Sequence, residues 1–88
     1  MQRQLLQDVR VMKTVDDVIG MLRYKLNEKG YGTFSSRHEI LGVVTEEYHE
    51  FVEAVHKKDH VEMKNELIDI AVGCIFSAAC IEEKTIDW

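Results

Sequence analysis

The sequence predicts an all-α fold, a small helical bundle that is completed as a four-helix-type bundle by oligomerisation. Three observations support this prediction. The chain of 88 residues contains no proline and five glycines, so few positions interrupt a helix. Apolar residues recur at intervals of three and four, which is the period of an α-helix. Each such stretch begins with a possible capping residue. A chain of this length is expected to form a single domain, residues 1–88.

The first clear helix is predicted to begin at Thr14 and to end near Gly30. Thr14 is a capping residue, and Asp17 stands three positions later as its acidic partner. The segment 1–13 also has a helical apolar spacing, so it is either a separate helix or an extension of this one. The expected buried stripe consists of Val15, Val18, Ile19, Leu22 and Leu26.

The second helix is predicted to begin after a capping box formed by Ser36 and Glu39, and to run to about Lys58. Lys57 and Lys58 suit the negative end of the helix dipole. The expected buried stripe consists of Ile40, Val44, Tyr48, Phe51 and Val55.

The third helix is predicted to begin after a capping box formed by Asp59 and Glu62. Its first half carries an apolar stripe through Met63, Leu67, Ile70 and Cys74. The segment 70–81 is apolar nearly all round, and one small chain cannot cover such a helix. We therefore expect a homodimer or homotetramer whose interface includes Ile70, Val72, Ile75, Phe76, Ala79 and Ile81.

The composition excludes several classes of protein. Sixteen acidic and eleven basic residues give a net charge of −5, which argues against binding to nucleic acid. The most apolar stretch is shorter than the roughly 20 residues that span a bilayer, and the N-terminus lacks the apolar region of a signal peptide. Cys74 and Cys80 lie in an apolar run and are expected in the core, in a reducing compartment. We expect a soluble cytoplasmic protein without a membrane partner.

Two acidic residues on each of the last two helices break the apolar pattern. At about 100° per residue, Glu47 projects between Val44 and Phe51, and Glu50 lies at the edge of the same face. Glu66 and Asp69 occupy a similar position on the next helix. Burying an unpaired carboxylate is costly, so these side chains need a cation or a proton.

An antiparallel packing of the two helices allows these four carboxylates to converge. Oxygen ligands without histidine or thiolate favour Mg²⁺, or Mn²⁺, over Zn²⁺. The predicted metal ligands are Glu47, Glu50, Glu66 and Asp69. A carboxylate beside a metal-bound water can accept its proton, and Glu46 and Glu50 are both candidates for this catalytic role.

The segment TEEYHEFVEAVHKKDHVEMKNELIDIA resembles the signature of MazG-like nucleotide pyrophosphohydrolases, which is E-x-x-E, a spacer and E-x-x-D. The resemblance implies an enzyme that cleaves a nucleoside triphosphate, with Mg²⁺, to a monophosphate and pyrophosphate, and that assembles as a dimer or tetramer. Relatives often carry basic phosphate contacts on a further helix. Here Lys25, Arg37 and Lys64 are either triphosphate contacts or solvated surface charges.

Two other functions are considered. The chain is alternatively a non-catalytic helical assembly or regulatory module with the same scaffold. A di-iron bundle is suggested by two E-x-x-H pairs, Glu46 with His49 and Glu53 with His56, but the helical period places this row opposite the buried stripe. The aromatic residues that could either stack on a nucleobase or cover the core are Tyr24, Tyr31, Phe34 and Trp88. The sequence does not predict which base is preferred.

Overall fold

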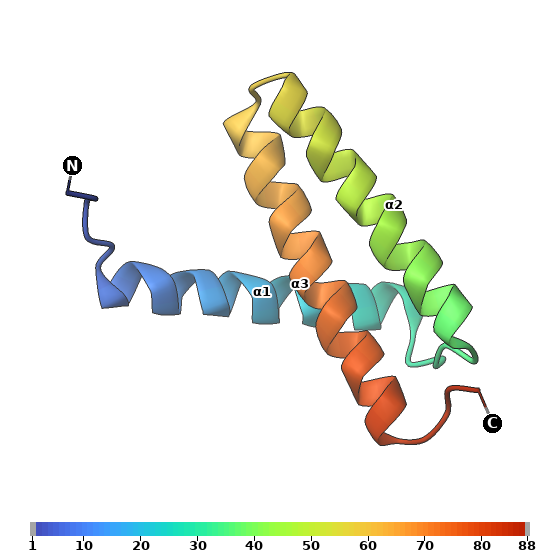
Figure 1. Cartoon of the computed structure of the whole chain (residues 1–88). Helices are drawn as coiled ribbons and strands as arrows, with labels where there is room; N and C mark the ends of the chain where they lie inside the picture. The colour runs from blue at the N-terminus through green and yellow to red at the C-terminus, as the bar shows by residue number, and fades with distance from the viewer. Residues whose placement is uncertain (1, 88) are drawn as a thin grey trace.

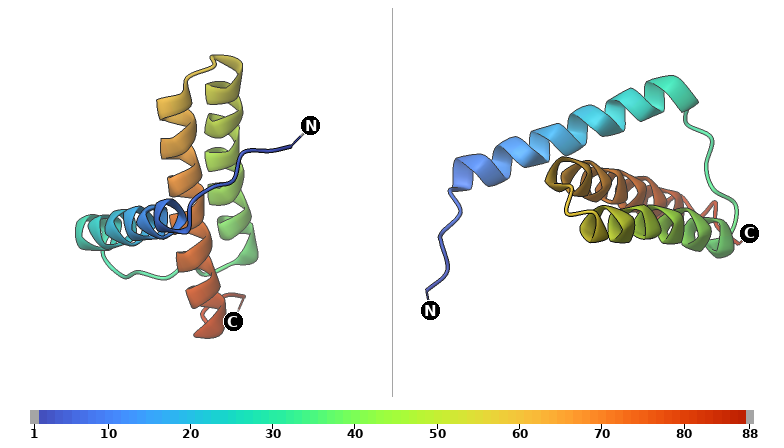
Figure 2. Two further views of the ribbon diagram at one scale, coloured as in Figure 1. Left: turned by 90° about the vertical axis from the view of Figure 1, so that its left-hand side faces the viewer. Right: turned by 90° about the horizontal axis from the view of Figure 1, so that it is seen from above.

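The computed structural model describes residues 2–87 and contains, within that range, three α-helices and no β-strand. The helices are α1 (Asp8–Lys29), α2 (Arg37–His56) and α3 (His60–Glu82). Figure 1 shows α2 and α3 side by side as an antiparallel hairpin, with α1 crossing α3. In the views of Figure 2, α1 lies on the α3 side of the hairpin. The prediction of an all-α fold is confirmed. No helix in the described range is both long and apolar enough to cross a membrane.

The starts of α2 and α3 confirm Ser36 and Asp59 as N-cap residues, the first half of each predicted capping box. The hydroxyl oxygen of Ser36 accepts a hydrogen bond from the backbone N–H of Glu39 at 3.1 Å. The carboxylate of Asp59 accepts one from the N–H of Glu62, also at 3.1 Å. Each bond satisfies a donor that the first turn of a helix leaves without a partner.

The start of α1 differs from the prediction. The helix begins at Asp8, its N-cap residue Gln7 makes no capping bond with its side chain, and Thr14 lies well inside, about 1.7 turns after Asp8. The hydroxyl of Thr14 donates to the carbonyl oxygen of Arg10 at 2.9 Å. A threonine hydroxyl can bond the preceding turn in this way, so it need not cap a helix. Residues 8–13 are therefore an extension of the first helix, and the predicted cap at Thr14 is wrong.

The turn between α2 and α3 fixes the antiparallel hairpin. The second helix ends at His56, two residues earlier than predicted, because Lys58 adopts a left-handed conformation with φ of 55°. The N–H of Lys58 donates to the carbonyl of Val55, and that of Asp59 donates to Ala54. This pattern is a Schellman motif, which ends a helix by reversing the chain.

The buried side chains are fewer and smaller than the sequence predicts. In the described range the buried apolar residues are Ala54, Val72 and Cys80, and the buried polar ones are Glu66 and Ser77. The predicted stripes are wrong at six positions that the chain leaves exposed: Val15, Ile19, Tyr48, Val55, Leu67 and Cys74. The buried residues of α3 are Glu66, Val72, Ser77 and Cys80, so polar and small side chains fill much of the buried face where the prediction placed Leu67 and Cys74.

The chain leaves an unusually large surface uncovered. It exposes 7370 Å², whereas a compact monomer of 10.2 kDa exposes about 5,300 Å². Its radius of gyration is 15.1 Å, compared with about 12 Å for a compact domain of this length. Exposed apolar side chains include Val11, Met12, Ile19, Leu41, Ile75 and Ile81. The prediction that one chain cannot cover its apolar surface agrees with these values.

One residue of the predicted interface, Val72, is excluded from it by burial. Val72 is buried within the chain, and the ring of Phe76 packs edge-on against Phe34 with centroids 5.5 Å apart. Val72 therefore belongs to the core of the chain, whereas Phe76 is half-buried. Ile75, Ala79 and Ile81 stay exposed, and these three, with the half-buried Ile70 and Phe76, remain predicted interface residues.

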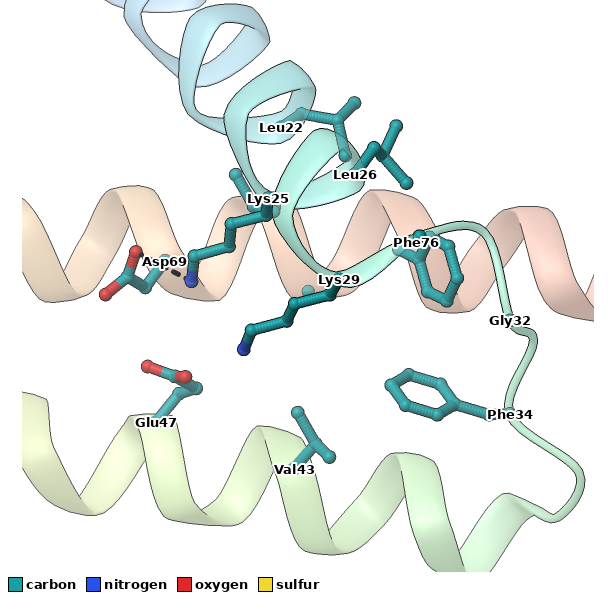
Figure 3. A pocket seen from close by; sticks show the side chains of 13 residues that line it. Leu22, Lys25, Leu26, Lys29, Gly32, Phe34, Val43, Glu47, Asp69 and Phe76 are labelled. Carbon is teal, nitrogen blue, oxygen red and sulfur yellow. Dashed lines mark ion pairs between the residues drawn. The ribbon is translucent and has the colours of Figure 1, made fainter.

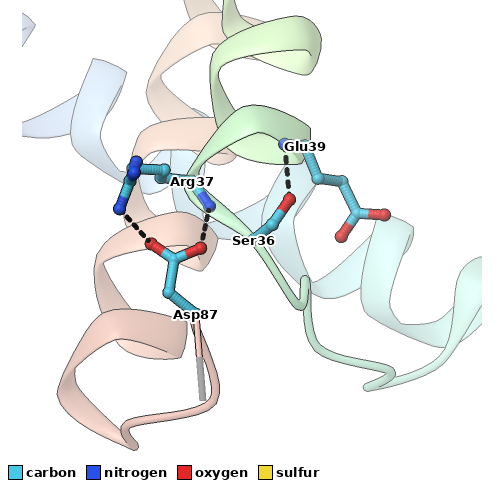
Figure 4. A network of polar contacts seen from close by, with 4 residues as sticks. All are labelled: Ser36, Arg37, Glu39 and Asp87. Atoms are coloured by element: carbon cyan, nitrogen blue, oxygen red, sulfur yellow. Dashed lines mark hydrogen bonds and ion pairs between the residues drawn. The ribbon is translucent and has the colours of Figure 1, made fainter.

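The C-terminal segment is tied to the start of α2 (Figure 4). The carboxylate of Asp87 accepts a hydrogen bond from the backbone N–H of Arg37 at 3.1 Å and pairs with its guanidinium at 3.2 Å. The N–H of Asp87 donates to the carbonyl of Ser35 at 2.8 Å. These bonds hold the segment after α3 beside the loop that carries Phe34.

Candidate metal centre

Three carboxylates from the α2–α3 hairpin converge on one point. Glu47 comes from α2, while Glu66 and Asp69 come from α3. One carboxylate oxygen of each lies within 4.8 Å of the corresponding oxygens of the other two. Residues three apart share a helix face, which is why the side chains of Glu66 and Asp69 project to the same side of α3. The antiparallel hairpin then brings Glu47 opposite them.

Two oxygens of this cluster are buried without a hydrogen-bond partner. They are the Oε2 atoms of Glu47 and Glu66. The whole Glu66 residue is only 7% exposed. Buried polar atoms in folded proteins are almost always paired, so orphaned carboxylate oxygens indicate a missing proton or cation.

Burial and crowding change the acidity of the cluster. Burial, reinforced by the carboxyl groups of Glu62, Glu50 and Asp69, raises the pKa of Glu66 from its ordinary 4.5 to about 8. Burial is also the main reason why the pKa of Glu47 is raised, and Asp69 and Glu50 add to the effect. Without a cation, the structure therefore favours a proton on Glu66 at neutral pH.

The donor set fits a hard divalent cation. All three side chains offer carboxylate oxygens, and no histidine or cysteine of the described residues joins the group. Mg²⁺ and Mn²⁺ prefer such oxygen ligands and keep water in their remaining positions. A divalent charge would also compensate the burial and the repulsion that together raise the two pKa values.

The remaining two predicted acids lie outside this group of three. Glu50 is exposed on α2, but it is close enough for its charge to raise the pKa values of Glu47 and Glu66. Glu46 is also exposed and lines a shallow groove on α2 together with Glu50. Both acids therefore stand at the margin of the cluster, and Glu46 raises the pKa of Glu47 less than Glu50 does.

The E-x-x-H pairs lie on the solvated face, as predicted. Glu46, His49, Glu53 and His56 are all exposed. None of them belongs to the group of carboxylates that could hold an ion. The arrangement of the described residues gives no support to a di-iron centre at these pairs.

The three basic candidates have different surroundings. Arg37 pairs with Asp87, and Lys64 pairs with Asp17 at 3.7 Å, so both serve contacts between parts of the chain. Lys25 differs, because its Nζ lies 3.1 Å from Oδ1 of Asp69. Of the three, Lys25 is the one that reaches the carboxylate cluster.

A cavity of about 330 Å³ opens beside Glu47 and Asp69 (Figure 3). It lies between the end of α1, the following loop and the α2–α3 hairpin. Its walls are mainly apolar, and Lys25 and Lys29 extend into it from α1. The apolar lining includes Leu22, Leu26, Phe34, Val43, Val72 and Phe76.

This cavity was not predicted, because it is built from three segments that are distant in the sequence. The available signal was on α1, where Lys25 and Lys29 follow Leu22 and Leu26 with the same helical spacing. Among the aromatic candidates, Phe34 lines the cavity, while Tyr24 and Tyr31 are exposed outside it. Trp88 lies outside the described residues.

Comparison with protein families identifies the segment that carries the acids. The family model of the MazG nucleotide pyrophosphohydrolase domain matches residues 35–88, which is more than half of the chain. The match contains α2, α3 and all the predicted metal ligands, while α1 lies before it. Comparisons with curated proteins and with solved structures each find no significant match.

Proposed function

Because the chain belongs to the MazG nucleotide pyrophosphohydrolase family, we propose that it is a Mg²⁺-dependent enzyme that cleaves nucleoside or deoxynucleoside triphosphates to monophosphates and pyrophosphate. One observation carries the proposal: three carboxylates lie within 4.8 Å of one another, and two of their buried oxygens have no partner. Mn²⁺ is the expected substitute for Mg²⁺, since both take oxygen ligands.

In this proposal Glu47, Glu66 and Asp69 hold the ion, with Glu50 as a further ligand at the margin. When bound, the ion supplies positive charge near the α-phosphate and makes a coordinated water more acidic. Glu50 accepts the proton of the attacking water, because it is exposed beside the cluster. Glu46 is the alternative base, from its position further along the exposed face of α2.

The cavity beside the cluster is proposed to receive the nucleoside. Its volume of about 330 Å³ and its apolar walls suit a flat aromatic ring, and the ring of Phe34 contributes to them. Lys29 extends from α1 into the same space and offers a positive charge to the phosphates.

The proposed enzyme works as a homodimer or homotetramer. The surface in excess of a compact monomer, about 2,000 Å² per chain, is of the size that obligate homodimers bury. Exposed apolar residues on all three helices, among them Ile19, Leu41 and Ile75, supply a surface of suitable chemistry. Two α2–α3 hairpins packed together would form a four-helix bundle.

A panel of nucleoside triphosphates, incubated with the protein and Mg²⁺, tests the proposed reaction. Chromatography should show a monophosphate and pyrophosphate in equal amounts, and chelation of the metal should stop their formation. Release of a diphosphate and inorganic phosphate would indicate cleavage at a different bond. No product with any nucleotide would favour the non-catalytic helical module.

A further inference from the structure

Lys25 on α1 occupies part of the carboxylate cluster. Its Nζ lies 3.1 Å from Oδ1 of Asp69, and both side chains are about three-quarters shielded from solvent, with 28% and 25% exposed. Shielding of this degree makes the pair stronger than an ordinary surface ion pair. Lys25 also precedes the segment that matches the family, so the pair is a feature of this chain beyond that match.

The position of this ammonium group conflicts with a bound divalent ion. Asp69 is one of the three carboxylates that could hold the ion, and Lys25 neutralises that same carboxylate. Two cations held a few ångströms apart in a partly buried site repel each other strongly. The attraction of Lys25 also opposes the effects that raise the pKa of Glu47, so its charge acts on the cluster beyond Asp69.

The ammonium group of Lys25 can move into the adjacent cavity when an ion binds. Its flexible four-carbon stem allows the ammonium group to move without a change in the backbone. Lys29 lies one turn further along the same face of α1, and both side chains extend into the cavity in Figure 3. A polyphosphate in that cavity would offer oxygens to both lysines.

We propose that Lys25 is an internal counter-ion of the metal centre, which pairs with Asp69 while no divalent ion is bound and moves to pair with the phosphates when the ion and the nucleotide bind. The movement toward phosphate rests on the proposed function, whereas the competition with the ion does not. Because the nucleotide removes the competitor, binding of the ion and binding of the nucleotide favour each other. Such coupling between ligands typically amounts to about 5-fold to 150-fold in affinity.

Titration of the full-length protein with Mn²⁺, without nucleotide, tests the competition. Free Mn²⁺ is measured by electron paramagnetic resonance for the wild type and for Lys25→Met, which keeps the length of the stem and removes the charge. Lys25→Met should bind Mn²⁺ about tenfold more tightly than the wild type, within the range expected for coupled sites. Equal or weaker binding would overturn the proposal.

Two matched variants separate competition from a general effect of charge. Lys29→Met removes a positive charge one turn away, from a lysine that forms no ion pair with another residue of the range 2–87. Lys25→Arg retains the charge at the site itself. Both variants should bind Mn²⁺ with a dissociation constant within about twofold of the wild-type value, which is less than the change expected for coupled sites. A gain in Lys29→Met equal to that in Lys25→Met would contradict a specific role of Lys25.

Calorimetry at saturating Mn²⁺ tests whether Lys25 moves to the phosphates. The probe is an α,β-methylene nucleoside triphosphate, which cannot be cleaved between its α and β phosphorus atoms. Lys25→Met should bind this analogue at least fivefold more weakly than the wild type, while Lys25→Arg should bind it nearly as tightly as the wild type. Unchanged binding by Lys25→Met would overturn the movement of Lys25 to the phosphates. Failure of the wild type to bind any analogue would instead contradict the proposed function, and the Mn²⁺ titration would still decide the competition.

Discussion

Glu47 and Asp69 face each other across the α2–α3 hairpin, close enough that the charge of Asp69 adds to the effect of burial in raising the pKa of Glu47 (Figure 3). Two charged carboxylates that approach in this way destabilise the folded chain unless one takes up a proton or a cation lies between them. The hairpin itself is fixed by independent features, namely the caps at Ser36 and Asp59 and the Schellman turn at Lys58. The fold therefore imposes the approach of the carboxylates.

Replacing a carboxylate of the cluster by its amide should remove activity and leave the fold intact. We expect Glu47→Gln and Asp69→Asn each to lower the turnover of nucleotide by at least about a hundredfold, because an amide keeps the volume of the side chain and removes its charge as a ligand. Steady-state rates of pyrophosphate release measure the loss, and circular dichroism measures the helical content.

Glu53→Gln is the matched control for these variants. Glu53 is an exposed glutamate on α2, outside the carboxylate cluster. Its amide variant should retain nearly the whole turnover rate. An equal loss in Glu53→Gln and Glu47→Gln, or full activity in both cluster variants, would contradict the assignment of the site.

Mg²⁺ or Mn²⁺ should raise the melting temperature of the protein without nucleotide. An ion that binds only the folded state adds about 2.7 kcal/mol to the free energy of unfolding at a hundredfold excess over its dissociation constant. Scanning calorimetry with and without millimolar Mg²⁺ measures the effect, with NaCl of equal ionic strength as the control. The shift should be much smaller in Asp69→Asn, which lacks one of the three carboxylates.

The metal-free protein should become less stable as the pH rises from about 4.5 to about 8. The folded state raises the pKa of Glu66 from 4.5 to about 8, so the folded chain retains a proton that the unfolded chain releases in this range. The stabilisation is complete below 4.5 and is lost as the pH passes through about 8. Urea unfolding at several pH values measures this trend.

Glu66→Gln provides the control for the pH trend, since its side chain does not titrate. The fall in the free energy of unfolding between pH 5 and pH 9 should be smaller in this variant. Saturating Mg²⁺ should reverse the trend in the wild type, because the ion binds the deprotonated carboxylates. A wild-type stability that rises with pH in the absence of metal would contradict the description of Glu66.

The protein should have a mass of at least twice 10.2 kDa in solution. Ile81, which is 59% exposed, is expected at the contact between copies, and Ile81→Asp should weaken association because it introduces a charge into an apolar contact. Sedimentation at several micromolar concentrations measures the mass. Glu82→Ala changes an exposed polar residue beside it and should leave the mass unchanged. A fully active wild-type monomer would contradict the proposed assembly.

Local signals in the sequence were sufficient for much of the fold. The caps at Ser36 and Asp59 are interactions within one turn, and both were predicted correctly. The cap at Thr14 failed because the same hydroxyl can also bond the carbonyl of Arg10 within a continuous helix. Short-range patterns thus identify a helix more reliably than its first residue.

The buried face of the third helix and the cavity both depend on contacts between helices, which local sequence patterns do not predict. A search for large apolar residues favoured Leu67, but the hairpin buries Glu66 and Ser77 instead. The carboxylates were found because acidic residues stand out within an apolar pattern. The pairing of Lys25 with Asp69 joins α1 to α3 across 44 residues of sequence, and no local pattern predicts such a contact.

Anomalous diffraction from crystals grown with Mn²⁺ tests the central claim most directly, because it locates the ion without depending on activity. The account predicts a peak within coordinating distance of the carboxylate oxygens of Glu47, Glu66 and Asp69, which lie within 4.8 Å of one another. It also predicts that Nζ of Lys25 lies further from Asp69 than 3.1 Å in the ion-bound protein. An ion bound at the exposed His49 face of α2, or no ion at the cluster at saturating Mn²⁺, would contradict the account.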